Sequence, residues 1–195
     1  MGMKISMNFS MDQDDLGRYA NAADLRHFYE SFSLSGLEVM PLGDDPQHLV
    51  EKDMVVGVHL RCITDWMDLD QEMLLAHYRR DLDYARRMQA EYVVFHVTQV
   101  SYGESLTYEM RHSDAEVVYA AAAFINELLD GQDYPFWFLM ENLWWPGLNM
   151  LDADITSRLL SKVHYAKKGI MLDMGHFMNN HYHLQTPEDA IVCLN

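Results

Sequence analysis

Five residues whose side chains bind metal ions or transfer protons stand at or just after the ends of short apolar runs. His59 closes the run Val-Val-Gly-Val-His, His96 closes Tyr-Val-Val-Phe-His, and Glu141 closes Phe-Trp-Phe-Leu-Met-Glu. Asp173 closes Gly-Ile-Met-Leu-Asp, and His176 follows it. Neutral imidazole nitrogens and carboxylate oxygens are ligands for divalent zinc, manganese, cobalt and iron. The same groups also serve as general acids and bases.

These residues would meet if each apolar run were a strand of a parallel sheet, because the carboxyl ends of such strands converge on one face. Each residue taken alone also has a structural interpretation. A histidine at a strand end is commonly a hydrogen-bonded core residue, and Asp173 could cap a turn through Gly175. Together they favour a divalent-metal site, since a cation offsets the cost of burying carboxylates against apolar strands.

The elements that must position these residues alternate along the chain. Apolar runs predict strands over residues 4–9, 36–42, 54–60, 92–97, 136–140 and 169–172. Helical periodicity predicts helices over 22–34, 69–89, 113–129 and 155–163, and a last helix opens at Thr186-Pro187. Ser113 is the expected N-cap of the third helix.

Continuous apolar strands indicate burial on both faces, which is typical of parallel sheets covered by helices. The predicted class is therefore α/β, either a β/α barrel or a doubly wound sheet. A barrel of eight units typically needs about 250 residues, and this chain has 195. We expect residues 1–195 to form a single barrel-type domain with about six of the eight β/α units, its C-terminal units missing.

Composition narrows the classes of function. The chain is 49% hydrophobic, which indicates a folded protein, and it has no apolar run long enough for a transmembrane helix. Its formal net charge of −16 disfavours nucleic acid as a partner. Cys62 and Cys193 are far apart and lack metal-site spacing, which suits the reducing cytoplasm.

Two motifs resemble a known family. Glu141-Asn142-Leu143-Trp144, and Leu172-Asp173-Met174-Gly175-His176 after an apolar strand, are similar to motifs of the xylose isomerase-like TIM-barrel superfamily. The run Ser-Gly-Leu-Glu-Val near residue 36 resembles that family's second strand. The superfamily includes sugar isomerases, sugar epimerases and DNA-repair enzymes of the endonuclease IV type.

The resemblance implies roles for individual residues. Glu141 and Asp173 match the carboxylates that ligate a divalent metal, either Mn, Co, Mg or Zn. His176 matches a histidine that contacts substrate or metal, and Glu141 and His176 are the implied catalytic residues. His59 and His96 match positions of further zinc ligands in the endonuclease branch, and His59 is also a candidate substrate contact. Trp144 and Trp145 follow Glu141, and stacking on a sugar ring or anchoring of the loop are both open for Trp144.

Three functions follow as hypotheses. The first is a metal-dependent isomerase or epimerase of a sugar or sugar phosphate, which moves a proton beside a polarised carbonyl. The second is a metal-dependent phosphodiesterase of the endonuclease IV type. The third is a non-catalytic, truncated paralogue, because the family completes its site from seventh and eighth strands. The two edge strands of a six-stranded sheet could also pair between copies, which predicts a homo-oligomer.

Overall fold

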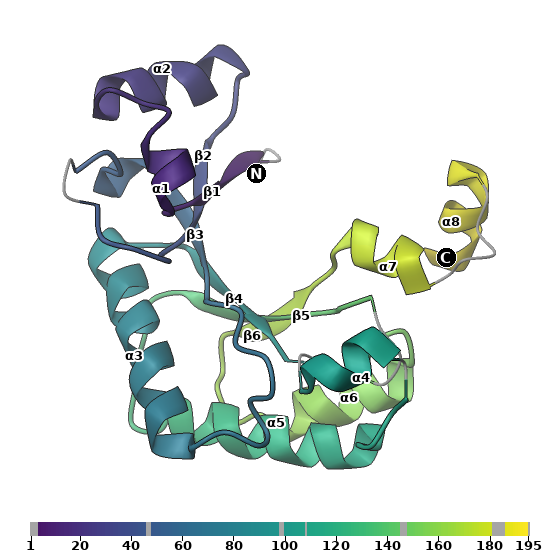
Figure 1. Cartoon of the computed structure of the whole chain (residues 1–195). Helices are drawn as coiled ribbons and strands as arrows, with labels where there is room; N and C mark the ends of the chain where they lie inside the picture. The colour runs from purple at the N-terminus through teal and green to yellow at the C-terminus, as the bar shows by residue number, and fades with distance from the viewer. Residues whose placement is uncertain are drawn as a thin grey trace. The chain divides into compact units, whose positions relative to one another are not determined.

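The six strands form one parallel sheet, and their order across the sheet is the same as their order along the chain (Figure 1). The computed structural model describes residues 4–45, 48–97, 100–107, 109–144, 148–180 and 186–194. The strands are β1 (Ser6–Ser10), β2 (Gly36–Met40), β3 (Val55–His59), β4 (Tyr92–His96), β5 (Trp137–Glu141) and β6 (Lys168–Met171). A doubly wound sheet reverses its direction of growth at a switch point, and the observed order contains no such reversal. The predicted α/β class with a parallel sheet is confirmed.

Helices separate the strands. They are α1 (Gln13–Leu16), α2 (Ala22–Ser31), α3 (Gln71–Met88), α4 (Tyr102–Thr107), α5 (Asp114–Leu128), α6 (Ala153–Lys162), α7 (Met174–Asn180) and α8 (Pro187–Leu194), with one 3-10 turn, η1 (Lys52–Met54). The sequence predicted the five longest helices. It missed α1, α4, α7 and η1, which have seven residues or fewer, because so short a helix shows hardly two turns of periodicity.

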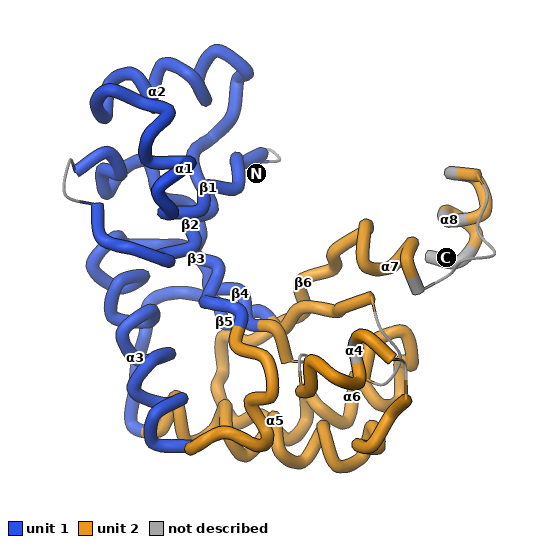
Figure 2. The backbone as a smooth tube through the Cα atoms, in the orientation of Figure 1, with its two compact units in different colours: residues 1–62, 71–95, 131–139 blue, residues 63–70, 96–130, 140–195 orange. Residues whose placement is uncertain are grey.

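The chain divides into two compact units (Figure 2). Unit 1 comprises residues 1–62, 71–95 and 131–139, and unit 2 comprises residues 63–70, 96–130 and 140–195. The apolar cores of both units come from the predicted strands and helices. Unit 1 buries Phe9, Leu37, Val58 and Phe95 completely or nearly so, and unit 2 does the same with Ala121, Ile125, Met140 and Leu159.

Unit 1 contains a polar connection across three strands. Glu38, Gly57 and Tyr92 are neighbours in register on β2, β3 and β4. The Tyr92 hydroxyl donates to Glu38 Oε2 at 2.7 Å. Gly57 leaves the space that this requires, since a Cβ at position 57 would lie 2.3 Å from Cζ of the Tyr92 ring. Burial and the hydrogen bond to Glu38 both raise the pKa of Tyr92, so the phenol remains a donor at neutral pH.

In unit 2, α5 begins as predicted. The Ser113 side chain accepts from the Glu116 backbone N–H, and the Glu116 carboxylate accepts from the Ser113 N–H, which completes a capping box. Further along the helix, Asn126 bonds to the last residue of α6 and to the segment that follows it. Its Nδ2 donates to Lys162 O at 2.9 Å, and its Oδ1 accepts from the His164 N–H at 2.7 Å. One amide therefore connects α5 to the end of α6.

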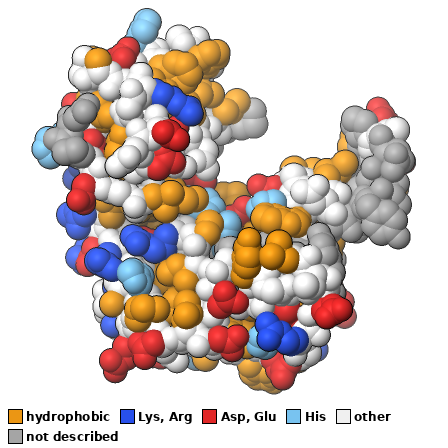
Figure 3. Space-filling view, viewed as in Figure 1, with side chains coloured by type: hydrophobic (Ala, Val, Ile, Leu, Met, Phe, Trp, Pro, Cys, Tyr) orange, Lys and Arg blue, Asp and Glu red, His pale blue; other side chains and the backbone are white. Residues whose placement is uncertain are grey.

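Charge is mixed over the surface. On the face drawn in Figure 3, Lys and Arg side chains are interspersed with Asp and Glu side chains. Arg86 pairs with Asp83 on α3 at 2.8 Å, as expected of a solvated helix face. Within the described ranges, every helix is too short or too polar to cross a membrane.

Candidate metal centre

Glu141 lies at the centre of a cluster of potential ligands in unit 2. It is the last residue of β5, and only 5% of it is exposed. His96, the last residue of β4, places Nε2 2.9 Å from Glu141 Oε2. His176 places Nδ1 3.6 Å from Glu141 Oε1. A nearly buried carboxylate thus lies between two imidazoles.

Asp173 and His176 reach this cluster from the end of β6. Asp173 directly precedes α7, and its Oδ1 accepts from the His176 backbone N–H at 2.7 Å. Its carbonyl accepts from the Phe177 N–H at 3.0 Å, the first bond of the helix. Asp173 is therefore an N-cap, as the structural interpretation proposed. The same cap places the Asp173 carboxylate beside the His176 imidazole, with Asp173 Oδ1 and His176 Nδ1 3.9 Å apart.

The three groups at the ends of β5 and β6 could hold a metal ion. One ligand atom from each of Glu141, Asp173 and His176 lies within 4.8 Å of the other two. Two carboxylates and an imidazole suit zinc, manganese, cobalt or iron. The contact between His96 and Glu141 could be a purely structural pair, which would account for these two residues without a metal. It does not explain why a second carboxylate and a second imidazole lie beside the same buried group.

The hydrogen bond of His176 determines which ring nitrogen can coordinate. Nδ1 lies 2.8 Å from the carbonyl oxygen of Asn142. A carbonyl only accepts, so Nδ1 carries the proton in this contact and Nε2 of the neutral ring carries the lone pair. Nδ1 is also the nitrogen that lies 3.6 Å from Glu141 Oε1 and 3.9 Å from Asp173 Oδ1, so this N–H faces both carboxylates as well as the carbonyl. Histidines that ligate metals commonly donate their other ring N–H to a carbonyl or carboxylate in this way. The backbone of β5 therefore orients His176 as well as Glu141.

Asn142 is the residue that sequence reasoning missed. It belongs to the Glu141-Asn142 motif, and the motif alone predicts no role for it. Its side chain is fully buried, and its Nδ2 donates to Asp173 O at 3.1 Å while its Oδ1 accepts from the Asp173 N–H at 2.7 Å. The available signal was the residue type, because an amide at the end of a buried strand must find both a donor and an acceptor.

Trp144 lies next to His176. The two ring centroids are 4.9 Å apart at an interplanar angle of 52°, and 38% of the tryptophan is exposed. Trp144 therefore packs on a cluster residue and also presents surface to solvent. Both predicted roles, loop anchoring and contact with a ring-shaped ligand, are compatible with this position. Trp145 lies outside the described residues.

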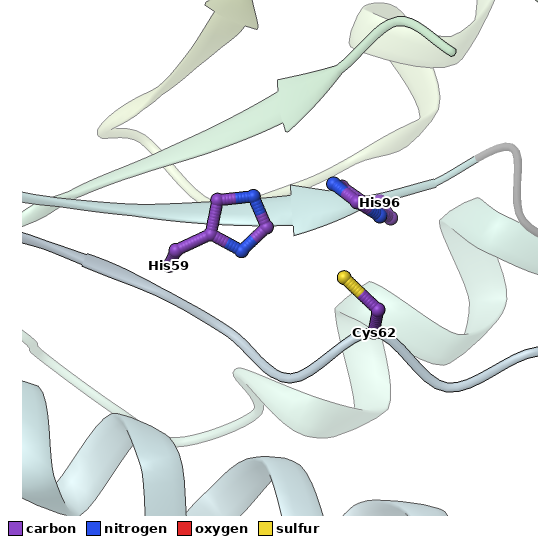
Figure 4. A group of neighbouring side chains, drawn as sticks. All are labelled: His59, Cys62 and His96. Carbon is purple, nitrogen blue, oxygen red and sulfur yellow. The ribbon is translucent and has the colours of Figure 1, made fainter. Parts of the chain in front are cut away.

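His59 belongs to unit 1, whereas Glu141, Asp173 and His176 belong to unit 2. It ends β3 and is 7% exposed, and its Nδ1 lies 2.9 Å from the carbonyl oxygen of Leu60. Figure 4 shows His59 at the end of β3, Cys62 in the segment after it, and His96 on β4. Within unit 1, a ring nitrogen of His59 and the Cys62 sulfur lie within 4.8 Å of each other, and Cys62 is exposed.

Unit 1 also contains a cavity of about 610 Å³ where β1 and β2 end. Its lining includes three carboxylates, Asp12, Asp44 and Asp45, and none of the predicted site residues. Asp12 caps α1 by accepting from the Asp15 N–H at 2.8 Å, and Asp45 accepts from the Val50 N–H at 2.9 Å. Two of the three carboxylates therefore have local structural roles.

Comparison with models of protein families finds none that matches this chain. Comparison with curated proteins also finds no match. The resemblance to the xylose isomerase-like superfamily therefore depends on the quoted motifs alone.

Proposed function

We propose that this chain is a divalent-metal-dependent isomerase or epimerase that acts on a sugar or sugar phosphate. We further propose that its parallel sheet is part of a β/α barrel of the xylose isomerase-like type. The observation that carries the proposal is the meeting of Glu141, Asp173 and His176 at the carboxyl ends of β5 and β6. In parallel α/β folds this is the end of the sheet where substrates bind.

The strand order supports the barrel. Strands that follow one another in chain order, joined by crossovers of one hand, place every crossover helix on the same side of the sheet. A sheet covered on one side by helices must bury its other side, and closure on itself does so. The row formed by Glu38, Gly57 and Tyr92 shows that side chains of neighbouring strands also pack on one another across the sheet, with the Tyr92 ring against Gly57.

The proposed roles follow from position. Glu141 and Asp173 hold the metal, and a bound divalent ion supplies the polarisation of a substrate carbonyl. Glu141 is also the acid–base group, because its nearly buried carboxylate lies where the three potential ligands meet. His176 contacts substrate or metal through Nε2. Trp144 beside it offers an aromatic face to a sugar ring.

Metal content is the direct test. Protein purified without chelators or a histidine tag should contain about one equivalent of a transition metal per chain by mass spectrometry. Glu141→Gln and Asp173→Asn should lose it, while Asp68→Asn, which removes an exposed carboxylate in the same unit, should retain it. Equal metal content in all four proteins would overturn the assignment of the site.

Turnover tests the reaction class. A panel of ketoses and ketose phosphates, each with Mn²⁺, Co²⁺ or Mg²⁺, should contain a substrate that the wild type interconverts and Glu141→Gln does not. Proton exchange with solvent at the carbon beside the carbonyl should accompany turnover. A metal-loaded protein that exchanges no proton on any member of the panel would contradict the isomerase proposal.

One observation favours the phosphodiesterase alternative. His96 adds a second imidazole beside Glu141, and additional histidine ligands fit zinc-dependent hydrolysis. The net charge of −16 opposes it, because affinity for a duplex comes largely from neutralising phosphates. Cleavage of an abasic-site duplex in the presence of Zn²⁺ would establish this alternative, and lack of binding at about 50 mM salt would reject it.

A further inference from the structure

Just after β5 and β6 end, the side-chain amide of Asn142 continues the hydrogen bonding between the two segments. The backbone N–H of Asn142, the residue after β5, donates to Met171 O at 3.4 Å. Beyond this backbone bond, the side chain of Asn142 makes the next two hydrogen bonds between the two segments. It donates to the Asp173 carbonyl and accepts from the Asp173 N–H. A side-chain amide has the donor and acceptor of a peptide group, so it can extend pairing where the backbones diverge.

This bridge connects residues that are all next to the candidate ligands. Asn142 follows Glu141 in sequence and bonds to the backbone of Asp173 on both sides of its Cα. Its carbonyl also accepts from His176 Nδ1 at 2.8 Å. One fully buried residue therefore contacts or adjoins each of the three groups whose ligand atoms converge.

We propose that Asn142 is the positioning residue of this centre: its side chain fixes the Asp173 backbone against the end of β5, which sets the separation of the Glu141 and Asp173 carboxylates. The proposal rests on the proposed function, because it takes Glu141, Asp173 and His176 as the metal-binding set. Asn142 itself contacts no metal or substrate. It acts through the Asp173 backbone, to which both polar atoms of its side chain bond.

The same chain offers a matched control. Asn126 makes the same two-point bridge in the same unit, with Nδ2 donating to Lys162 O and Oδ1 accepting from the His164 N–H. Asn126→Ala and Asn142→Ala each remove one amide, one donated bond and one accepted bond. A general loss of stability should therefore appear in both variants, whereas a loss of metal affinity should appear only in Asn142→Ala.

The main experiment is calorimetric titration of the three proteins with Mn²⁺ alone, after removal of bound metal. We expect Asn142→Ala to bind Mn²⁺ about 10- to 100-fold more weakly than wild type, the range found when partners of metal ligands are removed. Asn126→Ala should bind within about twofold of wild type, because its bridge touches none of the ligands. A folded Asn142→Ala protein with wild-type affinity would overturn the proposal.

Nitrogen-15 NMR of the metal-free proteins provides a second readout. The Asp173 amide signal should shift in Asn142→Ala and stay unchanged in Asn126→Ala, because only the first substitution removes the Oδ1 that accepts from the Asp173 N–H. Faster hydrogen exchange of the Asp173 amide should accompany this change. If wild type binds no metal, the proposed function fails, and an unchanged signal and exchange rate of the Asp173 amide in Asn142→Ala would overturn the positioning role as well. Should Asn142→Ala not fold, Asn142→Ser replaces it, since its short hydroxyl cannot reach both groups of Asp173.

Discussion

Two buried carboxylates in unit 2 differ in what surrounds them. Glu104 is 1% exposed and accepts from the backbone N–H groups of Arg111 and His112 and from His112 Nδ1 at 2.8 Å. Two of its donors are fixed backbone groups, which indicates a structural carboxylate that ties α4 to the segment before α5. Glu141 instead has two imidazoles beside it, and an imidazole nitrogen can also coordinate a cation. The identity of the partners, more than burial, separates a structural acid from a candidate catalytic one.

The surroundings of Glu104 predict a pH-dependent stability. Burial acts to raise its pKa, but the hydrogen bonds from His112 and Arg111 outweigh burial and lower the pKa below its ordinary value of 4.5. The stabilisation is therefore complete above pH 4.5 and is lost as the pH falls through the lowered pKa. Glu104→Gln should cost about 1 kcal/mol at pH 7, because charged acceptors make stronger hydrogen bonds than neutral ones. Urea unfolding at pH 7 and pH 3.5 checks this, and an equal cost at both values would contradict it.

Trp144 gives a second prediction at this scale. If its ring stacks on the substrate, Trp144→Ala should raise KM about 2- to 10-fold with a smaller change in kcat, as expected for an aromatic contact of about 0.5–1.5 kcal/mol. Trp137→Ala removes a tryptophan that is 52% exposed at the start of β5 and is the matched control. Steady-state kinetics on the substrate found in the panel would measure both. Equal effects of the two substitutions would assign Trp144 to loop anchoring.

At the scale of elements, the predictions from sequence were accurate where periodicity is long. All six strands and the five longest helices were expected within a few residues of their observed bounds. The clustering of Glu141, Asp173 and His176 was also foreseeable, because parallel strands bring their carboxyl ends together. The role of Asn142 was not, since its bonds depend on the register and divergence of β5 and β6. Those are properties of two strands in contact, and one strand's sequence does not contain them.

The β3 glycine predicts a sharp packing defect. In Gly57→Ala the new methyl group would overlap the Tyr92 ring, which must then move away from Glu38. We expect a loss of about 1–3 kcal/mol in the free energy of unfolding, the usual cost of overpacking. The double variant Gly57→Ala with Tyr92→Leu should lose less than the sum of the two single variants, as expected of residues in direct contact. Strict additivity in urea unfolding would show that the overlap is relieved elsewhere.

The capping box of α5 predicts a smaller effect. Ser113→Ala removes the side chain that accepts from the Glu116 N–H and should cost about 1 kcal/mol. Ser113→Asp keeps an N-cap acceptor and should retain most of the stability. Thermal unfolding of the three proteins compares them, and a neutral Ser113→Ala would mean that packing of the apolar face of α5 alone determines where the helix begins.

At the scale of the whole molecule, charge is the dominant feature. A formal net charge of −16 over 195 residues generates self-repulsion that dissolved salt screens. Raising NaCl from about 10 mM to about 300 mM should therefore raise Tm, by about 2–4 °C for each kcal/mol of repulsion relieved. Sucrose of equal osmolarity is the control for solvent effects without ions. A Tm that is independent of salt would mean that the paired charges, such as Arg61 with Asp81, already balance the field locally.

The contact of Tyr92 with Glu38 across Gly57 also restricts how this chain can evolve. A side chain larger than hydrogen at position 57 displaces the ring, and a smaller residue at position 92 leaves the Glu38 carboxylate without its phenol donor. Substitutions at positions 38, 57 and 92 therefore depend on one another. In descendants of this sequence we expect them to change in concert, with a neutral residue at 38 wherever 57 has gained a side chain and 92 has lost its hydroxyl.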